Sequence, residues 1–418
     1  MAEALRFCMV TTFYPPWHFG GDAIFVGRLA GALAAAGHRV DVVHSVDAYR
    51  LRRPRPHEAV LADHPNLTRI PLESASARFA AGLAHQLGRP ALYRRRLEEV
   101  LDRDYDVIHF HNVSLMGAPE ILRWGRALKL YTAHEYWLVC PTHVLFAFNR
   151  EACTEKRCFA CTLSQGRVPQ AWRATARLRQ ALEHVDTLLF PSRFALERHR
   201  AEGLSRPLEL LPHFVPEPEP PRARESPRGR PFFLYAGRIE KLKGVQDLLG
   251  LFASEPRADL VIAGDGSYRR TLERQARGLT HVQFRGHLDA APLAELYRDA
   301  VALVVPSLCY ETFGLSAAEA MSHGTPVLAR RIGALGEMIE QSGAGFAFDR
   351  LEECASAMDR LLREPDLRSS LGRRGQTAVR ERWSLPVHLE RYLDLVRARL
   401  AARREAPAPA PPLVEVGA

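Results

Sequence analysis

The sequence predicts an α/β protein of two domains, each built around a parallel sheet. Three observations indicate this class. At 418 residues the chain is too long for one ordinary core and suits two domains of roughly 150–200 residues each. Short β-branched and aliphatic runs, such as 300–305, are typical of strands that are buried on both faces. Segments with helical spacing follow these runs, as in strand–helix–strand units.

A segment rich in proline and charge, 216–231, is typical of an extended linker. It predicts an N-terminal domain at 1–215 and a C-terminal domain at 232–380. A last helix is expected at 381–405. The remaining residues, 406–418, are rich in alanine and proline and are expected to be disordered.

The composition is that of a soluble globular protein, with 47% hydrophobic and 25% charged residues. No stretch approaches the ~20 apolar residues that span a bilayer, and no secretory signal is visible after residues 5–12. The net charge is +9, but the basic residues are not interleaved with aromatic residues and no nucleic-acid motif occurs. We therefore expect a cytoplasmic protein that does not bind nucleic acid.

The chain opens on a strand–helix–strand unit with glycines at the start of its helix. The unit comprises strand 5–12, helix 23–36 and strand 39–44. Gly20 and Gly21 precede the helix, where glycine allows backbone to approach a ligand closely. Asp22 is expected to cap the helix.

An arginine triplet, Arg94-Arg95-Arg96, follows in a segment that suggests two helices broken at Pro90. One interpretation is contact with phospholipid headgroups or a polyanionic acceptor. The other is an ordinary solvated helix face, which surface composition favours.

Two further strands, 106–112 and 129–134, end in polar residues. Ligands of open α/β sheets bind beyond the carboxyl ends of the strands, so His109, His111 and His134 fall where a site is expected. A structural role remains the alternative for His109 and His111, and we prefer it for His109.

Four cysteines, Cys140, Cys153, Cys158 and Cys161, form a C-x12-C-x4-C-x2-C pattern. Disulfides are not expected in a reducing cytoplasm, and four close thiolates suit a tetrahedral structural zinc. Unligated thiols remain the alternative, because only the last pair has the common C-x2-C spacing.

The second domain opens on strand 232–236, and a loop with two cations leads into helix 245–253. Arg238 and Lys243 lie in that loop, close to the start of the helix. They would add two positive charges to the positive end of the helix dipole, which suits a pyrophosphate group.

The run 300–305 predicts a strand that leads through a loop into a helix near Ser316. Ser316 and Glu319 match the S-x-x-E capping box, so Glu319 is expected in the first helical turn and Glu311 in the loop. The unpaired amides at the helix start would suit a phosphate. They belong to Phe313, Gly314 and Leu315.

These patterns together resemble the retaining nucleotide-sugar glycosyltransferases of family 4. The resemblance is carried by the E-x7-E spacing of Glu311 and Glu319, the G-R-x4-K-G pattern around Arg238, and the T-x-H-E pattern at His134. It is strong in the C-terminal half and weaker before residue 130. It implies the GT-B fold, in which two Rossmann-like domains face each other across a cleft and the last helix crosses back onto the N-terminal domain.

The resemblance also implies a donor and roles for the residues. The donor would be a nucleoside-diphosphate sugar whose leaving diphosphate is neutralised by Arg238, Lys243 and the amide region at Gly314. Glu311 would bind donor-sugar hydroxyls, and Glu319 would bind the ribose. His134 would contact the sugar from the opposite domain, and the Gly20-Gly21 pair would contact the donor phosphate or the acceptor. No metal would be needed for catalysis, and some family members carry a similar cysteine-rich insert.

The acceptor implied by the family is a glycan, a glycolipid or a small molecule, with possible peripheral contact at the inner face of the membrane. Two other functions remain open. A nucleotide-sugar 2-epimerase of the same fold would need acids and bases at the sugar ring. A non-catalytic scaffold would have no need for all four of Glu311, Glu319, Arg238 and Lys243.

Overall fold

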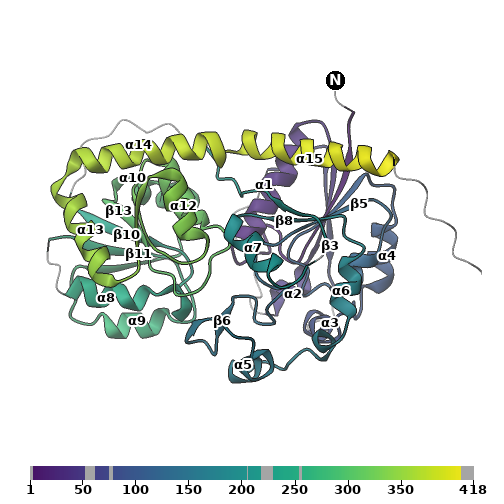
Figure 1. Ribbon diagram of the computed structural model, residues 1–418, viewed down its shortest axis with the longest axis horizontal. Helices are drawn as coiled ribbons and strands as arrows, with labels where there is room; N and C mark the ends of the chain where they lie inside the picture. The colour runs from purple at the N-terminus through teal and green to yellow at the C-terminus, as the bar shows by residue number, and fades with distance from the viewer. Residues whose placement is uncertain are drawn as a thin grey trace, which may run out of the picture.

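The computed structural model describes residues 3–51, 62–74, 79–204, 206–217, 229–253 and 257–405. It shows two α/β lobes, bridged along one side by two long helices, α14 and α15 (Figure 1). Each lobe contains one parallel sheet, which confirms the predicted fold class. Most of the expected linker, and the expected tail at 406–418, lie outside the described residues.

The sheet of the N-terminal lobe has seven strands in the order β3-β2-β1-β4-β5-β8-β9, all paired in parallel. Strand β1 lies inside the sheet and aligns Phe7 with Val40 of β2 on one side and with Val107 of β4 on the other. The strands are β1 (Arg6–Thr11), β2 (Arg39–Ser45), β3 (Leu67–Leu72), β4 (Val107–Phe110), β5 (Leu128–Thr132), β8 (Thr187–Phe190) and β9 (Leu208–Leu210).

The sheet of the C-terminal lobe has six parallel strands in the order β12-β11-β10-β13-β14-β15. Its central strands β10 and β13 are formed by the apolar runs that the sequence marks as buried strands. The strands are β10 (Phe232–Ala236), β11 (Asp259–Ala263), β12 (Val282–Gly286), β13 (Ala302–Val305), β14 (Val327–Arg330) and β15 (Gly345–Phe348).

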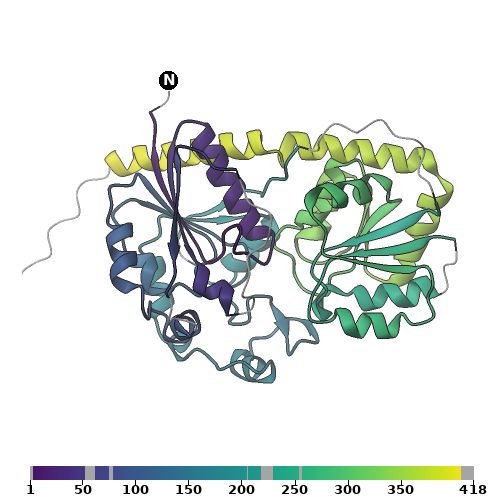
Figure 2. The ribbon, with the colours of Figure 1, turned by 180° about the vertical axis from the view of Figure 1, so that it is seen from behind.

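Helices cover both faces of each sheet, as Figure 2 shows from behind. In the N-terminal lobe they are α1 (Gly21–Ala35), α2 (Val46–Arg50), α3 (Ala80–Leu87), α4 (Arg94–Leu101), α5 (Cys158–Ser164), α6 (Arg177–Leu182) and α7 (Arg193–Arg200). In the C-terminal lobe they are α8 (Val245–Ala253), α9 (Arg269–Gln275), α10 (Ala290–Asp299), α11 (Leu315–Ser322), α12 (Ala334–Ser342) and α13 (Leu351–Arg363). Three short 3-10 turns complete the set, η1 (Glu120–Arg123), η2 (Ala171–Ala174) and η3 (Lys241–Lys243), with a hairpin of β6 (Phe146–Ala147) and β7 (Glu151–Ala152).

The last two helices join the lobes. α14 (Pro365–Arg382) packs on the C-terminal lobe, and α15 (Leu385–Glu405) lies along the N-terminal lobe (Figure 1). Tyr392 and Val396 of α15 are fully buried in the same apolar core as Phe7 of β1. The backbone of Val215 donates to Trp383 O at 2.9 Å, so the two chain crossings between the lobes are bonded to each other.

Two predictions about how helices begin are wrong. α11 begins at Leu315 after Gly314, whose φ of 106° is left-handed, so Glu319 lies in the second turn. The expected capping box is absent, because no side chain caps this helix and Glu319 accepts instead from the Tyr297 hydroxyl at 3.2 Å. Asp22 also does not cap α1, which begins one residue earlier, at Gly21.

Candidate active site

The carboxyl ends of the two sheets meet between the lobes. Thr312, in the loop after β13, donates its hydroxyl to His134 O after β5 at 2.8 Å. The Tyr136 hydroxyl donates to Glu311 O at 3.3 Å. Residues far apart in the sequence therefore meet where ligands of parallel sheets bind.

An ion pair links the two loops of the C-terminal lobe that carry the predicted motifs. Lys243 Nζ donates to Glu311 Oε1 at 2.6 Å, and Ser307 Oγ donates to the same oxygen at 2.7 Å. Glu311 Oε2 has no hydrogen-bond partner among the described residues. Lys243 has three donors, of which one is used here. The pair thus retains an acceptor and two donors for a ligand.

Charge and burial act in opposite directions on this pair. Burial opposes the ionised form of Glu311, but the Lys243 ammonium and the hydrogen bonds from Lys243 and Ser307 outweigh it and lower the pKa of the carboxyl. Burial likewise opposes the charge of Lys243, and Glu311 outweighs it and raises the pKa of the ammonium. Both groups are therefore charged at neutral pH, since the two shifts widen the pH range in which the pair exists.

Backbone contacts hold the two loops together. Leu308 N donates to Leu242 O at 2.8 Å, directly beside Lys243 and Glu311. Gly244 has a φ of +72°, and a Cβ there would lie 2.0 Å from Pro306 O, so only glycine allows this approach. The positions of Lys243 and Glu311 therefore depend on backbone packing as well as on their own ion pair.

The start of α11 lies beside the start of α1 of the other lobe. A Cβ at Gly21 would lie 2.7 Å from Leu315 Cδ1, so Gly21 permits close packing across the lobes. Phe313 is buried, and Gly314 at the helix start supplies the left-handed turn. The first amides of this helix have no partner within the helix, which leaves a positive end facing the junction.

Glu319 faces a cation that the sequence did not suggest. Burial raises its pKa, and the positive charge of Arg28 on α1 opposes that rise. Burial in turn lowers the pKa of Arg28, which Glu319 opposes. Arg28 lies in a helix whose pattern predicts only a core face and a solvent face, so no local signal could have identified it.

His134 is the centre of a chain of histidines. Its Nε2 lies 2.9 Å from His111 Nδ1, and its Nδ1 lies 3.0 Å from His213 Nε2. Burial lowers the pKa of His134 to about 4, so the ring is neutral. Both ring nitrogens thus face other histidines, and sugar contact by this ring requires one of those bonds to be exchanged. His109 is structural, as preferred, because it bonds Tyr392 Oη at 3.0 Å and Thr132 Oγ1 at 2.8 Å inside the core.

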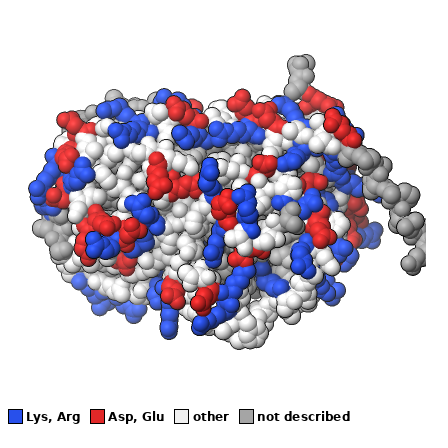
Figure 3. All heavy atoms as spheres, viewed as in Figure 1, with Lys and Arg blue, Asp and Glu red and all other residues white. Residues whose placement is uncertain are grey.

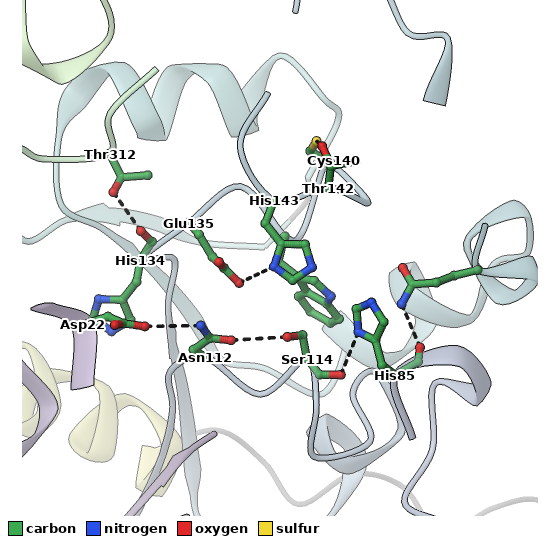
Figure 4. Close-up of polar contacts among 12 residues, drawn as sticks. Asp22, His85, Asn112, Ser114, His134, Glu135, Cys140, Thr142, His143 and Thr312 are labelled. Carbon is green, nitrogen blue, oxygen red and sulfur yellow. Dashed lines mark hydrogen bonds and ion pairs between the residues drawn. The ribbon is translucent and has the colours of Figure 1, made fainter. Parts of the chain in front are cut away.

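A second polar group lies next to His134 on the N-terminal lobe (Figure 4). Asn112 donates to Asp22 Oδ2 at 3.3 Å. Glu135 Oε1 lies 2.8 Å from His143 Nδ1. These side chains follow β4 and β5 and the turn into α1, so they form the N-terminal wall of the junction.

The predicted residues thus fall into three places. Glu311, Lys243 and the amide region at 313–315 lie together in the C-terminal lobe. Arg238 is exposed beside them, and its charge helps to lower the pKa of Glu311. Gly20, Gly21 and His134 lie on the opposite wall. The four cysteines line a separate hollow beside β6 and β7.

Family models match both halves of the chain. The model described as "Glycosyltransferase Family 4" matches residues 19–217. The model described as "Glycosyl transferases group 1" matches residues 217–378. The two matches meet at residue 217 and together span 19–378.

Individual proteins agree with these models. A glycogen synthase of Mycobacterium tuberculosis is 28% identical over 98% of this chain and 99% of its own length. A GDP-mannose-dependent α-(1-6)-phosphatidylinositol dimannoside mannosyltransferase of the same organism is 27% identical over 87% of this chain and 89% of its own.

Solved structures of glycosyltransferases share the fold. The sucrose-phosphate synthase of Thermosynechococcus elongatus matches with a TM-score of 0.72 and 22% identity, over 95% of this chain and 100% of that one. Anabaena HepE in complex with UDP-glucose matches with a TM-score of 0.64 and 15% identity, over 94% and 100%. The fold is therefore GT-B, and the chain belongs to the glycosyltransferases of family 4.

Proposed function

We propose that this chain transfers a sugar from a nucleoside diphosphate to an acceptor hydroxyl, with retention of the anomeric configuration. The observation that carries the proposal is the Lys243–Glu311 pair at the junction of the lobes, with Arg238 beside it. Lys243, held by Glu311, the exposed Arg238 and the start of α11 would stabilise the charge that develops on the leaving diphosphate. Because these groups are already in place, little reorganisation is needed when the bond to the sugar breaks.

Glu311 would bind the donor sugar rather than attack it. Its Oε1 is held by Lys243 and Ser307, which leaves Oε2 to accept a sugar hydroxyl. Glu319, close to Arg28, would accept hydroxyls of the ribose. The departing phosphate oxygen would help to deprotonate the acceptor on the same face of the sugar, so that no protein nucleophile is required.

The donor and acceptor classes follow from chemistry and from the relatives. A nucleoside-diphosphate sugar fits the cationic loops, and HepE binds UDP-glucose in its solved structure. The acceptor would reach the sugar from the N-terminal wall, where Asp22 and Glu135 offer carboxylates to hydroxyl groups. A glycan, glycolipid or small molecule remains the expected acceptor.

The direct test is incubation with UDP-, GDP- and ADP-sugars, followed by measurement of nucleoside diphosphate and of the released sugar. Slow release of a sugar with unchanged ring stereochemistry at C2 supports a transferase. Release of a sugar inverted at C2 would instead show a 2-epimerase. Saturable binding without any turnover, with or without a glycan acceptor, would show a scaffold. The anomeric configuration of a transfer product, read by NMR, tests retention.

Transfer is expected to continue in excess EDTA, because Lys243 and Arg238 replace a divalent cation at the diphosphate. Two Asp-x-Asp patterns, at 102–104 and 104–106, mimic the D-x-D of metal-dependent glycosyltransferases. They lie at the opposite end of the sheet, where Asp104 pairs with Arg6 and Asp106 accepts from Arg6 N. The rate after brief chelation should match the rate before it. Loss of activity that added Mn²⁺ restores would contradict this prediction.

An apolar surface on the N-terminal lobe indicates where a lipid-linked acceptor would be met. Phe79 and Leu83 lie one turn apart at α3, and Phe159 and Leu163 one turn apart on α5. Phe79 is 83% exposed, and Phe159 is 70% exposed. Gln86 donates to Val168 O at 3.0 Å, which ties α3 to the segment after α5. The exposed large apolar side chains of this surface are Phe79, Leu83, Leu92, Phe159, Leu163 and Val168.

Basic side chains accompany this apolar surface. Arg89, Arg157 and Arg167 are exposed around it. Figure 3 shows basic side chains next to uncharged atoms at the edge where α5 lies. Apolar groups with flanking cations fit a bilayer that contains anionic lipids. None of the helices in the described part of the chain has the length and apolar character of a membrane span.

The protein is expected to bind vesicles that contain phosphatidylglycerol and to bind phosphatidylcholine vesicles weakly. Phe159→Ser should reduce binding about tenfold, since burying a phenyl group contributes roughly 1.5–3 kcal/mol. Leu210→Ser, which changes an exposed apolar residue on β9, serves as the control and should bind normally. Equal vesicle binding by wild type and both variants in a flotation assay would rule out this surface.

A further inference from the structure

The segment from Cys140 to Cys161 forms a small projection with four thiols directed to one place. Cys140, Cys153, Cys158 and Cys161 all line the same hollow, together with residues of the β6–β7 hairpin. None of the four is in a disulfide. The other three cysteines are buried in the domain cores. This gathering is therefore specific to the projection, which lies on the side of the molecule opposite α14 and α15 (Figure 1).

The projection has too little apolar core to fix its own shape. Its hairpin consists of two strands of two residues each. Helix α5 buries only Thr162. Tyr136, Cys140 and Leu145 make up the buried part of its apolar cluster. Hairpins and segments of this size need another constraint to be stable.

The backbone of the projection is also strained. Four non-glycine residues of the described chain have positive φ, and all of them lie between the first two cysteines. Such conformations cost of order 1 kcal/mol or more each, and they persist only where the surroundings impose them. They are His143, Leu145, Phe148 and Asn149. Phe148 and Asn149 lie in the turn between β6 and β7, and this hairpin has only two residue pairs to constrain the backbone.

The strained turn places donors around a thiol. Phe148 N donates to Cys161 Sγ at 3.2 Å, and Gln165 Nε2 lies 3.5 Å from the same sulfur. Hydrogen bonds of this kind stabilise a metal-bound thiolate and fix its direction. Cys158 and Cys161 lie three residues apart at the start of α5, so both sulfurs leave one turn of the helix. If Cys161 is a metal ligand, the left-handed backbone at Phe148 has a function, because it directs the Phe148 N–H to the Cys161 sulfur.

We propose that Cys140, Cys153, Cys158 and Cys161 bind one zinc ion that holds this projection in place. Four thiolates complete a tetrahedral site and leave no open position, so the metal would be structural. Among the described residues no group of three or more Cys, His, Asp or Glu side chains is already in metal-binding geometry. Cys140 Sγ bonds Thr142 Oγ1 at 3.3 Å, and Cys153 Sγ donates to Glu155 O at 3.4 Å. Both partners are two residues away, so rotation about χ1 releases these sulfurs toward the hollow.

Metal binding would also order the neighbouring wall of the active site. Tyr136 N donates to His143 O, and Cys140 N donates to Tyr136 O at 2.7 Å, so the first ligand is coupled to the residues after His134. Arg198 on α7 donates to Cys153 O at 2.9 Å and fixes the other end of the projection to the lobe. The zinc would therefore act on acceptor binding through the fold rather than through contact with substrate.

The test is elemental analysis of the full chain purified in reducing buffer without chelator, with about one zinc per chain expected. Cys158→Ser should lower zinc content and thermal stability together, since binding energy in a small metal site is largely folding energy. Cys354→Ala, in the core of the other lobe, is the control and should keep its zinc. Replacement by Co²⁺ should give thiolate-to-metal charge-transfer absorption in wild type and in the control only.

Two readouts do not depend on how well a variant folds. In the wild-type protein, a strong chelator should make these four thiols reactive and should open 140–161 to limited proteolysis. Metal-free protein whose projection resists protease would overturn the proposal. Disulfides among the four cysteines found by mass spectrometry, or bound iron with sulfide, would overturn it as well.

Discussion

Lys243→Ala is expected to lower kcat/KM for transfer about 100-fold or more while leaving the two lobes folded. Preorganised charge stabilisation of a leaving group is commonly worth ~3 kcal/mol, which is about two decades in rate. Glu311→Gln should cause a loss of similar size, because the neutral amide has one acceptor oxygen and cannot serve both the sugar and the Lys243 ammonium. Steady-state kinetics with the best donor of the nucleotide-sugar panel measures both effects.

This experiment must distinguish a loss of folding stability from a loss of catalysis. Removing one partner of a well-buried pair costs up to ~3–5 kcal/mol of folding free energy. Lys243 and Glu311 keep 17% and 20% of their side-chain surface exposed, so the loss here should be smaller. Lys241→Ala changes an exposed lysine in the same turn and should leave kcat/KM unchanged. Near-normal turnover by Lys243→Ala or Glu311→Gln, with the melting temperature preserved, would show that the site is elsewhere.

Local pattern was sufficient for the framework of the fold. The apolar run at 232–236 and the helical spacing at 245–253 predict β10 and α8 with their observed bounds. The alternation of apolar and polar residues does not identify a strand such as β10, because both of its faces are buried. The signal is a short, continuous run of aromatic and aliphatic residues between turn residues, and parallel sheets bury such runs. The break at Pro90 likewise falls between α3 and α4.

Tertiary contacts account for what the sequence could not show. Glu319 was assigned to a capping box, but its carboxyl is directed to Tyr297 and Arg28, from another helix and from the other lobe. His213 reaches His134 across 79 residues of chain. Neither contact is indicated by a local hydrophobic periodicity or by a sequence motif. Lys243 and Glu311 are 68 positions apart in the chain. The sequence indicated both residues only because each belongs to a motif of its own.

Acidification is expected to unfold the protein in the range between pH 6.5 and pH 4. Five histidines surround the junction of the lobes, and each has its pKa lowered first by burial. The pKa of His134 and that of His388 fall to about 4. The five are His109, His111, His134, His213 and His388. Four of them lie beside Phe25, Phe214 or Tyr392, and His111 lies between His109 and His134. Asp22 and Glu135 favour the charged form of His134, but burial outweighs them.

Proton binding determines the direction in which the free energy of unfolding changes with pH. Above the unfolded pKa of about 6.5, both states hold neutral histidines and the free energy of unfolding does not depend on them. Below it, the unfolded chain binds protons that the folded chain does not, so stability falls until the folded pKa is reached. Each such histidine costs about 1.4 kcal/mol per pH unit, and five cost about 7 kcal/mol per unit. That is comparable with the whole stability of a typical domain.

The measurement is the free energy of denaturant unfolding, followed by circular dichroism, at several pH values from 8 to 4. His213→Gln should make the fall with decreasing pH less steep by about one proton, since one buried group no longer titrates. Leu393→Val is the control, because it removes a buried methylene from the same core and should lower stability by a similar amount at every pH. Unchanged stability between pH 7 and pH 5 would mean that protons reach these imidazoles without unfolding. The histidine chain through His134 would then be able to carry charge at the junction of the lobes.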